Sequence, residues 1–402
     1  MKQGLLFALL LIGCASKTEV GAPSAAEMVK FRGLPTAPTE AAEWLLAGTS
    51  DATWDSGLEE AARLLVQASP DRLARLSPRS VQAALARSGY PGYARFSSEL
   101  TGGGPPERLR AELHRGANQR SQPSDLAMAR RQFGDGTVLW IGAVAHRPVL
   151  LDPVPQTLSL DERLGVGIEV LDPESEDPLA RLPKPVLFIT PPFGPVRSMR
   201  LTPGTTRWVD GFIEPGPYQM EVVARGERTT QVVLKWSVFV DSTPPEVPRL
   251  QRGSLENPNP AEATQALYRA LNDMRSAAGL PPVERFFPFE PLAREHAALM
   301  ASSGVVDHRI AGLTPGVAAR IAERFHPGAR TFENLAAAPN WQQALDMVRL
   351  SPGHLANLFC EECTHASIGV ALEPITDRIP RLFVVWELLE FPEGAPQPRA
   401  RQ

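Results

Sequence analysis

Apolar residues at helical spacing, followed by two apolar β-type runs, organise residues 263–392. One helix face is indicated by apolar residues three and four positions apart: Leu267, Leu271 and Met274. Asn259 and Pro260 suit the N-cap and the first helical position of this helix. The two β-rich runs, 366–372 and 381–389, come last. Helices around a small sheet predict a layered domain of α-helices and β-strands.

Residues 41–149 repeat this order of elements. Apolar residues recur at helical spacing in three segments: 58–65, 79–85 and 109–113. The region ends on the apolar run 137–145, which predicts a buried strand. We therefore expect a mainly helical domain that is a diverged internal copy of residues 263–392. It has no set of His and Glu residues matching the later region, so the copy would keep the scaffold and not the site.

Residues 150–242 change to short β-type runs separated by Gly and Pro turn signals. The runs are 164–171, 185–190, 207–212, 218–223 and 231–240. Regularly spaced short strands predict a β-sandwich of immunoglobulin-like architecture. Gly216, Pro217 and Tyr218 resemble the turn that precedes a late strand in such domains. This region is expected to be a spacer or an adhesion module.

The composition supports several domains and does not suggest a nucleic-acid partner. The chain has 402 residues and a net charge of −4, without the basic excess that binding to nucleic acid needs. Its 40 prolines gather in turns and linkers. Residues 243–262 are predicted to be a semi-rigid linker, and residues 393–402 a tail.

The N-terminus is typical of a secretory signal that ends at a cysteine. Lys2 precedes an apolar run at 5–12 that is too short to span a bilayer. Leu-Ile-Gly-Cys at 11–14 resembles the bacterial lipobox, which implies a signal peptide at 1–13 and lipidation, such as palmitoylation, of Cys14. The lipid would be the membrane anchor, because no later segment has the sequence of a transmembrane helix. Residues 14–40 would then be a tether, and the absence of Asp after the cysteine favours the outer membrane of a bacterial cell envelope.

Two further cysteines lie close together, Cys360 and Cys363. In an oxidising envelope compartment, two nearby thiols are expected to form a disulfide. A redox-active pair is less favoured, because Glu361 and Glu362 between the sulfurs raise thiol pKa values, whereas redox sites lower them. A zinc site is disfavoured because only two cysteines are available.

An ordered set of motifs gives the C-terminal region a family resemblance. The motifs are LNDMRSAAGLPPV, LAREHAALMASSGVVDH, FENLA, SPGHLANL, IGVAL and FVVWEL. Together they resemble the CAP superfamily of cysteine-rich secretory proteins, antigen 5 and plant pathogenesis-related proteins, and in particular its bacterial SCP-like branch. The resemblance covers about residues 263–390. It implies a three-layer α-β-α sandwich with a central cavity.

The resemblance also places a candidate site. The family cavity holds two histidines and two acidic residues, and some members bind a divalent metal there. By resemblance, His308 and His354 match the histidines and Glu333 matches one acidic residue. Ser351 stands at the second acidic position, so that this ligand is missing. His296, in the middle of a predicted helix, is expected to be a packed structural residue.

The chemistry of these residues leaves alternatives open. Ser351 and Pro352 are expected to start a helix, whose N-terminus favours a neutral His354, the form that binds metal. Zn²⁺ or another divalent metal could be held by His308, Glu333 and His354. The same three side chains could polarise water without metal, and Glu333 could instead only brace a loop.

The preferred hypothesis is an extracytoplasmic binding module on a cell-envelope lipoprotein. Its ligand would be a small molecule, lipid-like or otherwise apolar, or an envelope protein. The alternative is a metal-dependent hydrolase of peptides or esters that uses the His/Glu cavity. The missing second carboxylate counts against that alternative, so no catalytic residue is assigned.

Overall fold

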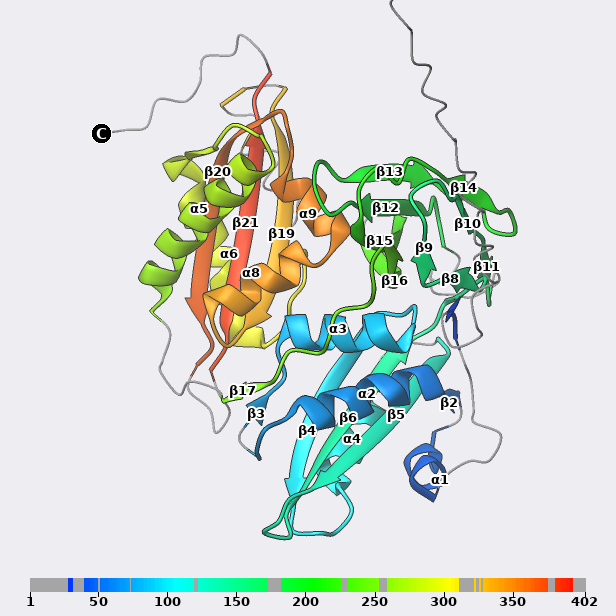
Figure 1. Ribbon diagram of the computed structural model, residues 1–402. Helices are drawn as coiled ribbons and strands as arrows, with labels where there is room; N and C mark the ends of the chain where they lie inside the picture. The colour runs from blue at the N-terminus through cyan, green and yellow to red at the C-terminus, as the bar shows by residue number, and fades with distance from the viewer. Residues whose placement is uncertain are drawn as a thin grey trace, which may run out of the picture.

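The computed structural model describes most of the chain in three regions of regular structure (Figure 1). The described residues are 28–31, 40–49, 51–72, 74–118, 122–172, 182–225, 230–252, 259–310, 322, 325–326, 328–374 and 380–392. The predicted signal peptide, Cys14, most of the tether and the tail at 393–402 lie outside them. No helix in this part of the chain is both long and apolar enough to cross a membrane.

The N-terminal domain is a four-stranded sheet with helices on both faces. Its helices are α1 (Glu40–Leu46), α2 (Ser56–Ala68), α3 (Pro78–Ser88) and α4 (Glu107–Ala117). Its sheet has the order β2-β5-β6-β4, formed by Ala52–Trp54, Ser124–Gln132, Val138–His146 and Ala94–Thr101. Strand β2 is parallel to β5, and the other pairs are antiparallel. The mainly helical prediction found β6 and missed the other three strands.

Local signals place the helices of this domain. Asp55 caps α2 by accepting hydrogen bonds from the backbone N–H groups of Gly57 and Leu58. Ser77 caps α3 in the same way, and Gly89 ends it in the left-handed conformation. Strands β5 and β6 then send alternate residues into two separate cores, one under α2 and α3 and one under α1 and α4.

The described residues of the central domain form strands and the turns between them. Its five-stranded sheet has the order β13-β12-β15-β16-β9, formed by Arg197–Arg200, Val186–Thr190, Gly216–Arg225, Thr230–Val240 and Thr157–Leu158. Short strand pairs accompany it: β1 with β8 (Met28–Val29, Val154–Pro155), β7 with β11 (Val149–Leu151, Ile168–Val170) and β10 with β14 (Leu164–Val166, Arg207–Val209). One core joins the sheet to these pairs. Tyr218 is fully buried, and its hydroxyl accepts a hydrogen bond from Glu214 N at 3.3 Å.

The C-terminal domain has the same strand order as the N-terminal domain. Its helices are α5 (Pro260–Ala277), α6 (Glu290–Ser303), α8 (Trp341–Arg349) and α9 (Pro352–Leu358), with a 3₁₀ turn η2 at Phe287–Phe289. Its sheet has the order β18-β20-β21-β19, formed by Glu284–Arg285, Cys363–Leu372, Leu382–Glu390 and Arg330–Ala338. Strand β18 is parallel to β20, and the other pairs are antiparallel, which matches the pattern of the N-terminal sheet.

Helices cover both faces of this sheet. One core lies under α5 and α8, and a second lies under α6. Gly369 of β20 lets α6 approach closely, since a Cβ atom there would lie 2.1 Å from the backbone carbon of Ala293. The predicted helix start is confirmed, because Asn259 caps α5 and Pro260 is its first residue.

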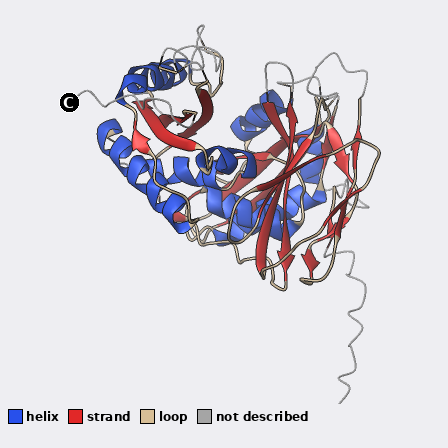
Figure 2. Ribbon diagram, turned by 90° about the horizontal axis from the view of Figure 1, so that it is seen from above, coloured by secondary structure: helices blue, strands red, loops and turns tan. Residues whose placement is uncertain are grey.

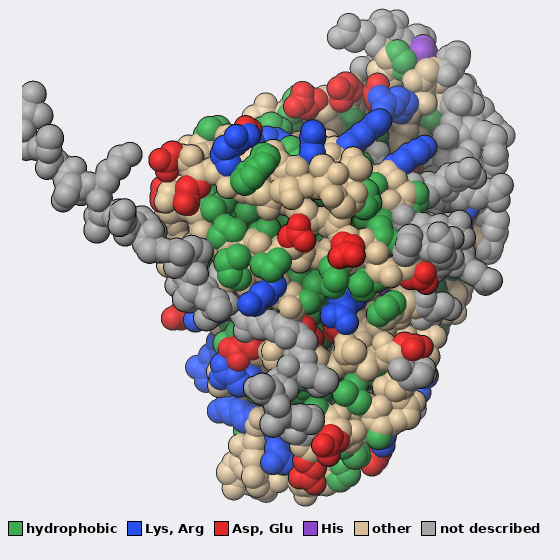
Figure 3. Space-filling view, turned by 90° about the vertical axis from the view of Figure 1, so that its right-hand side faces the viewer, with side chains coloured by type: hydrophobic (Ala, Val, Ile, Leu, Met, Phe, Trp, Pro, Cys, Tyr) green, Lys and Arg blue, Asp and Glu red, His purple; other side chains and the backbone are tan. Residues whose placement is uncertain are grey.

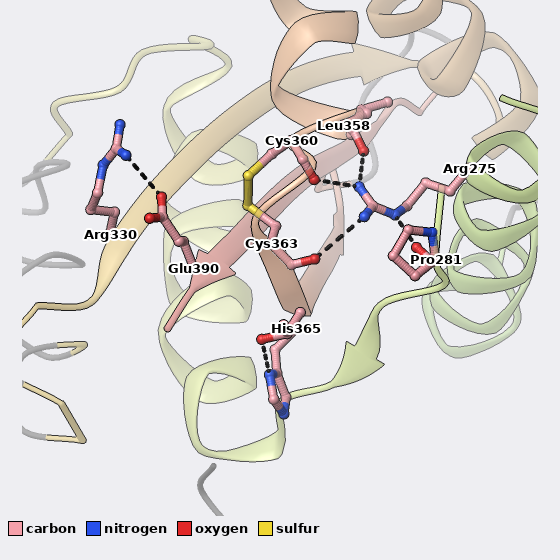
Figure 4. The surroundings of a disulfide bond; sticks show 9 residues. Arg275, Pro281, Arg330, Leu358, Cys360, Cys363, His365 and Glu390 are labelled. Carbon is pink, nitrogen blue, oxygen red and sulfur yellow. Dashed lines mark hydrogen bonds and ion pairs between the residues drawn. A yellow bond between two sulfur atoms is a disulfide. The ribbon is translucent and has the colours of Figure 1, made fainter. Parts of the chain in front are cut away.

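A disulfide joins Cys360 and Cys363 at the start of β20, as predicted (Figure 4). Arg275, fully buried at the end of α5, stabilises this turn by donating hydrogen bonds from Nη1 to the carbonyls of Leu358 and Cys360 at 2.8 and 2.9 Å. Burial lowers the pKa of Arg275, and the carbonyl oxygens around it replace the water that it loses.

The three domains contact one another. Helix α3 meets α8 through an ion pair between Arg79 and Asp346, whose Nε and Oδ2 atoms are 2.8 Å apart. Strand β17 (Gln251–Arg252), which lies within the predicted linker, pairs with β3 (Ala74–Arg75) of the N-terminal region. The view from above shows mixed helices and strands on the side of the C-terminus and mainly strands opposite (Figure 2). On the face of Figure 3, charged side chains of both signs are interspersed with apolar ones.

Candidate functional site

Glu333 is the centre of a buried polar cluster in the C-terminal domain. It lies on β19, on the sheet face that α6 covers. Its Oε1 atom accepts a hydrogen bond from Nδ1 of His308, at 2.6 Å, in the loop after α6. Its Oε2 atom accepts one from Nδ1 of His296, at 3.0 Å, in the middle of α6. Helix α6 and the loop after it therefore each bind one oxygen of this carboxylate.

A second carboxyl group completes this Glu333 cluster. Glu387 is the direct cross-strand partner of Glu333 on β21, and its side chain is buried. Burial, followed by the charge of Glu333, raises the pKa of Glu387 well above its usual range. Of the two facing acids, Glu387 is therefore the one that keeps its proton more readily.

These hydrogen bonds fix the charges in the cluster. Burial alone would raise the pKa of Glu333, but the hydrogen bonds from His296 and His308 oppose this, and the pKa falls to about 2. His296 donates from Nδ1 to Glu333 and from Nε2 to the carbonyl oxygen of Asp307 at 2.9 Å, so both of its nitrogens carry a proton. Burial would lower the pKa of His296, but the bonded carboxylate outweighs it and raises this pKa. A buried cation–anion pair results.

His354 belongs to a second set of contacts. Its Nδ1 atom is 2.7 Å from the hydroxyl oxygen of Ser351, one turn earlier at the N-cap position of α9. Ser351 in turn donates to Oε2 of Glu221 at 2.8 Å. Glu221 lies on β15 of the central domain, 130 positions away in the chain. We call Glu221, Ser351 and His354 the Glu221 relay.

Burial controls the charge of His354. It lowers the pKa of His354 to about 4, and the charges of His308 and Lys235 act in the same direction. The imidazole is therefore neutral at pH 7, as expected from the sequence. The expected cause, the N-terminus of the helix, is not needed, and the hydroxyl of Ser351 bonds to Glu221 instead of capping α9.

The predicted site residues form two sets. The structure joins His308 to Glu333, and His354 to Ser351, but no hydrogen bond links these two pairs through their side chains in the described residues. The nearest connection uses Asn334, whose side-chain amide donates to the carbonyl of His354 at 2.8 Å. The two histidines are near enough for the charge of His308 to affect His354.

The residues do not fit the predicted metal site. Both oxygens of Glu333 already accept N–H donors, which leaves that side chain unsuited to ligate a metal. Within the ranges that the structure describes, no group of three or more His, Cys, Asp or Glu side chains could hold a metal ion. The set of His308, Glu333 and His354 therefore does not assemble as a three-ligand centre.

Sequence reasoning missed three residues that shape the site. His296 is buried, as predicted, but it also bonds to Glu333. Glu387 had a signal in the sequence, because it is an acidic residue within an otherwise apolar strand. Glu221 had no such signal in the sequence, since its partner Ser351 lies in another domain. His365 is 2% exposed and packs between Phe286 and Phe391.

Comparisons with known proteins found one family model, within the C-terminal domain, and several solved structures. Residues 268–385 match the model of the cysteine-rich secretory protein family, CAP. An outer surface protein of Borrelia burgdorferi is 24% identical over 32% of this chain and 94% of its own, with a TM-score of 0.28. An extracellular protein with an SCP domain from Bacillus anthracis is 14% identical over 72% and 93%, with a TM-score of 0.28. A cysteine-rich secretory protein of Staphylococcus aureus is 12% identical over 61% and 86%, with a TM-score of 0.25. No curated protein matches the sequence.

Proposed function

We propose, taking residues 268–385 as a CAP domain, that this chain is an extracytoplasmic binding module of the bacterial cell envelope. Its ligand is a small molecule with an apolar part and a hydrogen-bond donor group. The site is the region around the exposed His308 and the half-buried His354.

The observation that carries this proposal is the state of His354. Its Nδ1 atom is tied to Ser351, its imidazole is neutral at pH 7, and its Nε2 atom has no hydrogen-bond partner among the described residues. Nε2 is then an acceptor that a ligand hydroxyl or amide can use. Glu333, by contrast, is saturated with donors and is unsuited to act as a general base.

The loop beside His308 supports an apolar ligand. His308 itself is 40% exposed through its side chain. The two valines shortly before it, Val305 and Val306, are 52% and 44% exposed. Exposed valines next to a histidine with one tethered nitrogen suit a ligand that is apolar at one end and polar at the other.

Binding of 1-dodecanol, compared with dodecyl methyl ether, tests the proposal. Both probes carry the same chain, but only the alcohol can donate to Nε2 of His354. We expect the alcohol to quench or shift tryptophan fluorescence with saturation, and the ether to bind at least about tenfold more weakly. Equal binding of both probes, or binding of neither, would overturn the proposal.

Variants locate the binding and test the rival hydrolase. The double variant His308→Ala, His354→Ala should lose binding of the alcohol, whereas His326→Ala should keep it, since the His326 ring accepts a hydrogen bond from the nearby backbone N–H of Gly328. Elemental analysis of the purified protein tests the alternative of a metal-dependent hydrolase. Stoichiometric zinc that disappears in His308→Ala would favour the metal-dependent hydrolase instead.

Lipid attachment at Cys14 is part of the same proposal. The apolar run at 5–12 and the cysteine that follows it support an anchor in the outer membrane. Cys14→Ser should move the protein from the membrane fraction to the soluble fraction. An unchanged distribution, with no lipid on the N-terminal peptide by mass spectrometry, would contradict the anchor.

The other two domains also receive a proposed identity. The buried Tyr218, bonded to the backbone four residues upstream, supports an immunoglobulin-like central module, because such a tyrosine corner is typical of that architecture. The shared strand order supports the N-terminal domain as a diverged internal copy of the CAP domain. A solution structure of residues 40–149 with a different sheet order would refute the second identity.

A further inference from the structure

We infer that Glu221 of the central domain is a positioning residue of the CAP site. Acting through Ser351, it holds the proton of His354 on Nδ1 and leaves Nε2 bare as an acceptor. What Nε2 then binds rests on the proposed function, but the position of the proton can be measured without any ligand.

The direction of each hydrogen bond follows from the groups involved. An ionised carboxylate only accepts, so the Ser351 hydroxyl must donate to Glu221, at 2.8 Å from Oε2 and 3.0 Å from Oε1. The hydroxyl has one proton, and after donating it can only accept. The contact of 2.7 Å with His354 therefore requires a proton on Nδ1. A neutral imidazole carries one proton, so Nε2 has none.

Glu221 is built into this position. It is 1% exposed, and Oε1 also accepts the backbone N–H of Gly353 at 2.9 Å. Its cross-strand partner on β16 is Lys235, which supplies the opposite charge. Burial raises the pKa of Glu221, but Lys235 and the two donors of α9 oppose this by favouring the carboxylate.

The glycine of the Ser-Pro-Gly-His sequence allows this contact. A Cβ atom at Gly353 would lie 2.8 Å from Oε1 of Glu221, closer than real Cβ atoms approach a neighbour. The side chains of Val223 and Phe188, also from the central domain, come next at 3.7 and 4.0 Å. The start of α9 is thus fitted against the central sheet, and the site depends on contact between the two domains.

The relay compensates for the acidic residue that the CAP domain itself lacks. Ser351 occupies the position where a carboxylate was expected from the family pattern, and its hydroxyl reaches one that a different domain provides. A carboxylate that fixes the tautomer of a neutral histidine has the same role in other sites where one imidazole nitrogen must stay unprotonated.

The variant Glu221→Gln gives the sharpest test, because it keeps the shape and reverses one hydrogen bond. The Gln oxygen should take the place of Oε1 and accept from Gly353, so the amide nitrogen faces the Ser351 hydroxyl and donates to it. Ser351 must then donate to Nδ1 of His354, and the proton moves to Nε2. We expect the Nδ1–H form to be the major tautomer in the wild type and the minor one in the variant.

The readout is the ¹⁵N NMR spectrum of histidine-labelled full-length protein at pH 7, where protonated and bare ring nitrogens resonate far apart. His354→Gln assigns the signal by its loss. The control is Asp346→Asn, which weakens another contact of the CAP domain with a neighbouring domain and should leave the tautomer unchanged. If Glu221→Gln does not fold, Ser351→Ala removes the relay and should also reduce the Nδ1–H form.

Three results would overturn the inference: a wild type with the proton on Nε2, an unchanged tautomer in Glu221→Gln and Ser351→Ala, or the same shift in the Asp346→Asn control. Binding of 1-dodecanol is a separate outcome. If the tautomer reverses in Glu221→Gln and the alcohol binds about tenfold more weakly, both proposals stand. If the tautomer reverses and binding is unchanged, the relay stands and the proposed ligand contact fails.

Discussion

The last strand of the N-terminal sheet, β6, and the last strand of the CAP sheet, β21, are each nine residues long, and in both the first eight are buried. They occupy the same place in sheets of the same order. Only β21 carries a charged residue type in the buried part, Glu387. The same scaffold therefore has an apolar last strand in one domain and a last strand with a buried acid in the other.

The N-terminal domain has a buried polar cluster of its own, and its contacts show the difference. Asp125 on β5 is fully buried and bonds to Tyr90 at 2.8 Å, to Thr53 at 2.9 Å and to Arg147 at 3.3 Å. These three partners all belong to the N-terminal region of the chain, as Asp125 does. In the CAP domain, by contrast, His308 of the Glu333 cluster is exposed to solvent, and the Glu221 relay includes a residue of the central domain.

Asp125→Ala should therefore have the largest effect on stability and none on the CAP site. It leaves Arg147 without its buried counter-charge, which costs about 3–5 kcal/mol. Urea unfolding of the N-terminal domain, followed by hydrogen exchange, measures the loss. Asp135→Ala, in the same domain but 49% exposed, should have a much smaller effect on the free energy of unfolding. A changed ¹⁵N signal of His354 in Asp125→Ala would show that the two clusters are coupled.

The cross-strand pair of the CAP domain should respond unequally to the same substitution. Glu333→Gln removes the carboxylate that His296 and His308 share, and we expect a loss of about 2–3 kcal/mol. Glu387→Gln replaces the acid whose pKa is raised and which, among the described residues, makes no hydrogen bond to His296 or His308, so it should cost less than about 1 kcal/mol. Equal costs for the two variants, measured by hydrogen exchange in β19 and β21, would disprove the assignment of charges.

Some features of the two domains could be predicted from the sequence, because neighbouring residues encode them. Helix caps, the cysteine pair and the ordered CAP motifs are encoded by neighbouring residues, and the disulfide and the CAP domain are confirmed. Strands β4 and β5 were missed, because Arg and Glu residues interrupt their apolar runs. Glu221 could not be predicted, since its role depends on how β15 packs against α9. His296 was taken as structural for lack of a visible partner.

The stability of the folded state should depend on pH in opposite ways through His354 and Asp125, between about pH 4 and 6. Folded His354 takes up a proton only near its pKa of about 4, whereas the unfolded residue does so near 6.5, so stability falls as the pH drops through this range. Burial, opposed mainly by Arg147, raises the pKa of Asp125 to about 6, above its unfolded value of about 3.9. The folded state then holds the extra proton, and stability falls as the pH rises.

Variants separate these two contributions. His354→Gln should remove part of the loss on acidification, seen as a flatter pH profile of hydrogen-exchange protection in the CAP domain. Asp125→Asn should remove the opposite slope in the N-terminal domain. A profile that changes in the same direction in both domains would contradict the pKa directions from which this expectation follows.

The smallest effect is expected where the two similar domains touch. Arg79 of α3 pairs with Asp346 of α8, but the arginine side chain is 57% exposed, so solvent screens the pair. Arg79→Ala should change stability by at most about 1 kcal/mol and lose most of that effect at high salt. Because Glu221 reaches α9 from the central domain, the tautomer of His354 should not change. A tautomer that did respond to Arg79→Ala would mean that the N-terminal copy also controls the CAP site, and that its scaffold has kept a role at the site.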